Sequence, residues 1–172
     1  EWSIPAPTEL TTEHSLPVLG FRPGLKHVVQ VSARDQAGNV SPAIPLDFET
    51  ASLPDDFPSL ELSMSSPEKM EPGVTLFAFM RWPEGAALDE HFGLAVAVDE
   101  HGDIVWYRRS GHAIQDPHRM SNGNLLSLIG HYGAEEVDIL GNVVTRWHAS
   151  QHPNPEANAE VPEGSIPVAT ET

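Results

Sequence analysis

The chain of 172 residues contains no cysteine, which excludes both a disulfide framework and a thiolate metal site. It is also poor in cations: 9 lysines and arginines stand against 25 acidic residues, giving a formal charge of −16. Because phosphate binding needs a basic face, nucleic acid is not an expected partner. No apolar run is long enough to cross a bilayer, so we expect no membrane insertion. The 16 prolines argue against long helices.

Short alternating segments separated by Gly, Asn and Asp turns make up most of the sequence, and they indicate an all-β fold. Residues 27–33 alternate between apolar and polar side chains and run into the turn Asp35–Asn39. A second extended segment then leads to Thr50. Alternation of period two on both sides of an Asp/Gly/Asn turn predicts a β-hairpin.

This hairpin resembles the C-terminal half of a fibronectin type III domain. The resemblance implies a partial β-sandwich over residues 1–50 with an unpaired strand edge, because the first strands of such a sandwich are missing. Residues 51–73 are rich in Pro, Ser and charge and are predicted to be a linker. The residues that carry the resemblance are Leu19-Gly20-Phe21-Arg22-Pro23-Gly24, the strand His27–Ala33, Asp35-x-x-Gly38-Asn39 and Phe48-x-Thr50.

One phrase occurs twice in the second half, as AVDEHGDIVWYR and as EVDILGNVVTRW. Asp99 corresponds to Asp138 and Gly102 to Gly141, each pair 39 residues apart. In both copies an apolar strand ends at Val-Asp, glycine supplies the positive φ of a tight turn, and a β-branched strand follows. A period near 40 residues with several short strands is typical of a β-propeller blade. We predict blades over residues 74–172, with a generic β-sandwich as the alternative.

The segments VDEHGDIVWYRR, DPHRMSNGNLLSLIG and EEVDILGNVVTRWH, in that order, resemble the arylsulfotransferases of the aryl-sulfate sulfotransferase type. In that family a small N-terminal β-sandwich precedes a six-bladed propeller, and the resemblance covers roughly residues 15–150. It implies nucleotide-independent transfer of a sulfuryl group from an aryl sulfate to a phenol through a sulfohistidine. It also implies an aromatic anion as substrate and no cofactor. The acidic, cysteine-free and proline-rich composition indicates a periplasmic or secreted location.

A propeller cannot close on two blades, because each unpartnered blade leaves an apolar face in water. At about 40 residues a blade, residues 74–172 hold only about two to two and a half blades. We therefore expect a complementary chain, or the rest of a nicked polypeptide, to complete the ring, and we expect this chain not to fold alone. The resemblance places the main catalytic histidines on that missing portion.

The segment that leads into the Asn-Gly turn holds the candidate catalytic residues of this chain. Asp116 and His118 are two positions apart and so should share one face of a strand. On a channel face, His118 could bind an anion or act as acid or base, oriented by Asp116. Alternatively, both side chains satisfy hydrogen bonds between blades. The candidate substrate-binding residues are Arg119, His112, His131 and Tyr132.

Arg108 and Arg109 are further candidate sulfate binders, with ordinary solvation as the alternative. The aromatic residues Trp106, Tyr107 and Trp147 are predicted to pack between blades, with an aryl-binding platform as the alternative. We predict no metal site, although His148 and a second histidine four positions later have helical spacing, because a proline follows them and makes a helix doubtful.

Two other functions remain open at this stage. A non-catalytic extracellular adhesion or scaffold propeller would suit an acidic, soluble surface. A hydrolase or lyase could use the same channel on another anionic aromatic substrate, because a propeller fold does not dictate its chemistry.

Overall fold

The computed structural model describes residues 11–81, 92–130, 133–150 and 163–168. These residues form ten β-strands in three sheets and a short 3-10 turn at Pro67–Lys69. The prediction of an all-β fold is therefore confirmed. The chain divides into two compact units, Glu1–Ser63 and Met64–Thr172.

The first unit is built on one antiparallel hairpin, formed by β1 (Lys26–Val31) and β2 (Ile44–Glu49). Its strands leave large apolar side chains in solvent, since Val28 is 58% exposed and Leu46 is 54% exposed. A two-stranded hairpin is marginally stable by itself in water. The partial sandwich with an unpaired edge therefore remains a prediction for this unit.

The residues that carry the fibronectin resemblance contact one another at the base of this hairpin. The ring of Phe21 lies edge-on to Phe48, with 4.7 Å between centroids, and 4.9 Å from the ring of His27. Oγ1 of Thr50 donates a 2.6 Å hydrogen bond to the carbonyl oxygen of Arg22. The motif thus joins the segment before β1 to the end of β2.

The second unit begins with a three-stranded antiparallel sheet in the order β3 (Thr75–Arg81), β4 (Phe92–Val98), β5 (Ile104–Ser110). The middle strand is buried on both faces from Leu94 to Ala97. A continuous apolar run is what a strand covered on both sides requires, which explains why the sequence FGLAVAV lacks the usual alternation.

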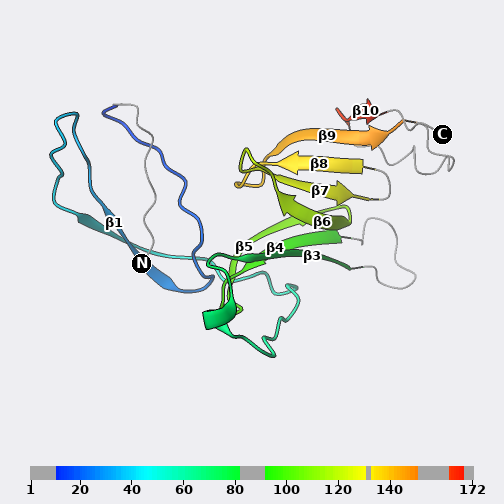
Figure 1. The fold of residues 1–172 in the computed structure, drawn as a ribbon, viewed down its shortest axis with the longest axis horizontal. Coiled ribbons are helices and arrows are strands. Elements are labelled where there is room, and N and C mark those ends of the chain that lie inside the picture. The colour runs from blue at the N-terminus through cyan, green and yellow to red at the C-terminus, as the bar shows by residue number, and fades with distance from the viewer. Residues whose placement is uncertain (1–10, 82–91, 131–132, 151–162, 169–172) are drawn as a thin grey trace. The chain divides into compact units, whose positions relative to one another are not determined.

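A second meander follows, formed by β6 (Ile114–Arg119), β7 (Leu125–Ile129), β8 (Gly133–Val137) and β9 (Val143–Ala149). The short strand β10 (Ile166–Val168) pairs in parallel with β9 and forms the fifth strand of this sheet (Figure 1). Alternation along β7 buries Leu125, Ser127 and Ile129 and leaves Leu128 exposed.

The chain returns from the outer strand β5 to place β6 beside β3 and β4. On this return it passes directly over Gly93 of β4. A Cβ atom built on Gly93 would lie 2.2 Å from the backbone nitrogen of Ile114 and 2.4 Å from the carbonyl oxygen of His112. Glycine is required here because the two backbones approach too closely for any side chain.

Both copies of the repeated phrase form the same five-residue turn. The amides of Asp99 and Asp138 donate to the carbonyl oxygens of Asp103 and Asn142 at 3.0 and 2.9 Å. The glycine in each turn has a φ above +80°. The turn at residues 35–39 in the first unit has the same hydrogen bonds, which shows that the turn itself is not specific to the repeat.

Candidate functional site

Strand β6 carries the predicted catalytic pair, and a β-bulge interrupts it. Gln115 pairs with Leu128 and His118 pairs with Leu126, so the register shifts by one residue between them. Asp116 has a φ of +48°, in the left-handed region that a non-glycine residue seldom adopts. A bulge at this point ends strict alternation along the strand.

The expectation that Asp116 and His118 share one face is therefore wrong. The register places His118 on the face of Leu126 and leaves Asp116 in the bulge. Both side chains are exposed, and no hydrogen bond or ion pair joins them within the described ranges. No contact between the two side chains supports a catalytic role for His118 or an orienting role for Asp116, and both roles remain predictions.

The candidate substrate-binding residues do not gather around His118. His112 precedes β6, whereas Arg119 ends it, and a strand of this length separates them by on the order of 20 Å. The backbone amide of His112 donates to the hydroxyl of Ser110 at 3.1 Å, and its side chain is exposed. His131 and Tyr132 lie outside the described residues.

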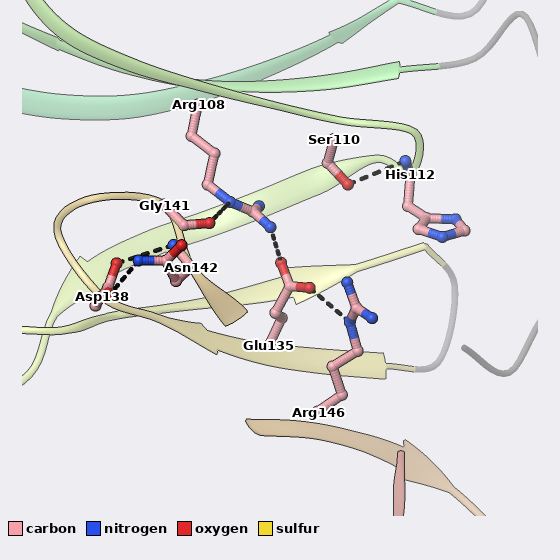
Figure 2. Close-up of polar contacts among 8 residues, drawn as sticks. All are labelled: Arg108, Ser110, His112, Glu135, Asp138, Gly141, Asn142 and Arg146. Atoms are coloured by element: carbon pink, nitrogen blue, oxygen red, sulfur yellow. Dashed lines mark hydrogen bonds and ion pairs between the residues drawn. The ribbon is translucent and has the colours of Figure 1, made fainter. Parts of the chain in front are cut away.

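A buried carboxylate, Glu135, is the centre of the polar cluster between the two sheets (Figure 2). Its side chain is 2% exposed. Nη2 of Arg108 on β5 lies 2.6 Å from one carboxylate oxygen. The two groups form an ion pair, but their orientation does not make a hydrogen bond. Nε of Arg146 on β9 donates to the other oxygen at 2.7 Å. One buried negative charge thus holds two cations, one from each sheet.

The cluster changes the interpretation of Arg108. Its Nε also donates to the carbonyl oxygen of Gly141 at 3.4 Å, so the guanidinium is held by the neighbouring sheet. A guanidinium in contact with a buried carboxylate compensates that charge and is not free for sulfate. Sequence reasoning missed Glu135 because an acidic residue in a strand normally indicates a solvent-exposed position.

A second carboxylate, Glu136, lies on the opposite face of β8 and is held by the Asn-Gly turn. One of its oxygens accepts hydrogen bonds from the side-chain amides of Asn124 at 2.5 Å and Asn122 at 2.9 Å. These two bonds, that of Asn124 foremost, lower the pKa of Glu136 below its usual value. The turn and the strand end are thus locked together by an ionised carboxylate.

The aromatic residue Trp106 reaches from β5 to the second sheet. Its Nε1 donates a 2.8 Å hydrogen bond to the carbonyl oxygen of Ile139, in the turn between β8 and β9. Trp106 and Arg108 are two positions apart on β5, so one face of that strand supplies both donors to the same turn. The repeated turn is therefore a contact surface as well as a connection.

Within the described ranges, no three His, Asp or Glu side chains are grouped closely enough to hold a metal ion. No helix among the described residues is long and apolar enough to span a membrane. Comparison with protein-family models, curated proteins and solved structures finds no match to this chain.

Proposed function

We propose that the unit Met64–Thr172 forms neighbouring blades of a β-propeller in an arylsulfotransferase-like enzyme. The observation that carries this proposal is the way its two meanders are stacked. The first strands β3 and β6 lie beside each other, while β5 binds the β8–β9 turn of the next sheet through Trp106 and Arg108. In a propeller, the first strand of each sheet lies near the central axis and the last strand lies at the rim. Sheets that meet first strand to first strand and rim to rim, as these two do, can be repeated around such an axis.

In this proposal the chain is the framework of the enzyme. Its buried charges hold one sheet to the next, and the complementary chain or remaining fragment supplies the principal histidines. A neutral imidazole would attack the sulfur of an aryl sulfate, the S–O bond to the aryl oxygen would break, and phenolate would leave. A phenol would then attack the sulfohistidine, break its S–N bond and give its proton to a base. The proposed location is periplasmic or secreted.

His118 is the residue of this chain proposed to contribute to anion binding. It is exposed at the end of β6, the strand that lies beside β3. Its exchange for glutamine would then weaken substrate binding more than turnover. Arg108 is excluded from such a role because Glu135 holds it.

The test is to incubate the complete native assembly with a chromogenic aryl sulfate, with and without a second phenol. Phenolate release together with a sulfated acceptor supports sulfuryl transfer. Release of phenolate with free sulfate and no sulfated acceptor would indicate a hydrolase. Heat-denatured assembly is the control for non-enzymatic hydrolysis.

A non-catalytic scaffold is the second candidate, and one observation favours it. The two acidic residues of β8 are both committed to structural contacts: Glu135 to two arginines and Glu136 to two asparagines. If neither phenolate nor a sulfated product forms in the assay, the scaffold function is preferred.

A further inference from the structure

We propose that the face of the second meander turned away from β5 is a docking surface for a third antiparallel sheet that carries its own Asp-x-x-Gly turn. The inference rests on the proposed propeller and specifies which side chains receive the next sheet. We call this surface the outer face. It consists of Leu126, Leu128, Ala134, Glu136, Thr145, Trp147 and Ile166. The charge of Glu136 is already bound by the side-chain amides of Asn122 and Asn124.

The direction of the outer face follows from the ion cluster. Glu135 pairs with Arg146 across β8 and β9, and Glu135 also contacts Arg108, so this side of the sheet faces β5. Side chains alternate along a strand, so Thr145 and Trp147 lie on the opposite side. The strand pairing aligns Leu128, Ala134, Trp147 and Ile166 as one row across the sheet.

The repeat shows what should cover this row. On β5, Trp106 pairs with Ala97, and on β9, Thr145 pairs with Glu136. Each pair lies next to a shift in strand register, between Ala97 and Val98 in the first copy and between Glu136 and Val137 in the second. Thr145 is thus the equivalent of Trp106. By the same register Trp147 is the equivalent of Arg108.

In the first copy, both positions donate to carbonyl oxygens of the next turn, at Ile139 and Gly141. In the second copy both positions again carry donors, the hydroxyl of Thr145 and the indole nitrogen of Trp147. Within the described residues neither donor has a hydrogen-bond partner. Indole N–H groups that become buried normally find an acceptor. A third turn of the same kind supplies two carbonyl oxygens at the required spacing.

The apolar part of the surface fits the same occupant. Leu128 is 52% exposed and Ile166 is 50% exposed, in a row that otherwise contains Ala134 and the half-buried Trp147. In the first sheet the equivalent row holds Ala78 and Ala95, and Ala95 is buried by the second sheet. A sheet packed on the outer face would remove Leu128 from water as the second sheet removes Ala95.

Hydroxyl-radical footprinting of the native assembly tests the proposal with a matched pair of leucines. Leu128 on the outer face and Leu140 in the β8–β9 turn are the same residue type and are 52% and 53% exposed in this chain. We expect at least fivefold less oxidation of Leu128 than of Leu140. Equal oxidation of the two would overturn the proposal.

A photo-crosslink identifies the occupant. With the substitution Leu128→p-benzoylphenylalanine, we expect irradiation to capture a peptide whose sequence does not occur in this chain and that contains an Asp-x-x-Gly turn between two strands. A crosslink to a second copy of this chain, to a helical protein or to no polypeptide contradicts the assignment.

The sulfuryl-transfer assay on the same preparation separates the two proposals. Turnover with an unprotected Leu128 would reject the docking surface alone. A protected Leu128 without turnover would reject the enzyme and leave the docking surface in place.

Discussion

The indole nitrogen of Trp106 donates a 2.8 Å hydrogen bond to the carbonyl oxygen of Ile139, 33 residues farther along the chain. The bond joins the last strand of one sheet to the last turn of the next. Together with Arg108, which reaches Gly141 in the same turn, it makes the repeated Asp-x-x-Gly phrase the site of contact between sheets. The repeat therefore specifies tertiary packing as well as local structure.

Trp106→Phe should separate the hydrogen bond from the packing of the ring. The phenyl ring retains most of the apolar contact, while the carbonyl of Ile139 loses its donor, so we expect a loss of about 1 kcal/mol of unfolding free energy. Urea unfolding of the native protein measures it. Leu140→Ala, which removes an exposed side chain from the same turn, is the control and should change stability by less than about 0.5 kcal/mol.

Glu135→Ala should be far more damaging, because it leaves Arg108 and Arg146 facing each other without their shared anion. Breaking a buried ion pair by removing one partner costs about 3–5 kcal/mol. The loss should appear as a large drop in the urea midpoint. Glu100→Ala is the matched control, since Glu100 pairs with His101 where both side chains are about half exposed or more, and it should cost under about 1 kcal/mol. Equal effects of the two exchanges would contradict the importance of the cluster.

The local elements of this fold could be predicted from the sequence, because alternation and glycine turns are local signals. The strands around the two Asp-x-x-Gly turns, and the turns themselves, are present as expected. The shared face of Asp116 and His118 was wrongly predicted because a bulge is not visible in alternation. Residues 115–119 read as a regular strand, yet the left-handed Asp116 moves His118 to another face.

The inter-sheet charges could not be predicted either. Glu135 and Glu136 are adjacent acidic residues, and no local signal indicates that one is 2% exposed and bound to two arginines. Which carboxylate is buried depends on the stacking of the sheets, and that is a property of the complete unit.

Gly93→Ala tests the crossing of the chain over β4. The added methyl group would meet backbone atoms of His112 and Ile114 at less than 2.5 Å, and backbone cannot move aside as a flexible side chain can. We expect a loss of at least about 3 kcal/mol, at the upper end of overpacking costs, seen as reduced soluble yield and a lowered midpoint.

The control for this exchange is Gly111→Ala on the same crossing segment. A Cβ atom at Gly111 meets no atom within 4 Å, and its backbone lies outside the left-handed region. The exchange should be neutral or slightly stabilising. If both alanine variants behave alike, the close approach at Gly93 does not constrain the fold.

The turn carboxylate of Asp138 should give the protein an acid-sensitive contact. Hydrogen bonds from Asn142, its side chain foremost and then its backbone amide, hold the pKa of Asp138 below the usual value of 3.8. Because the folded pKa is lowered, the stabilisation is fully present above the unfolded value and is lost as the pH falls through the folded pKa.

Asn142→Ala removes the largest contribution to the lowered pKa, so the titration midpoint of the Asp138 carboxyl carbon in NMR spectra should rise toward 3.8. Asn124→Ala, which breaks a bond to Glu136 instead, should leave that midpoint unchanged. A midpoint for Asp138 that does not respond to Asn142→Ala would contradict the control of its pKa by Asn142.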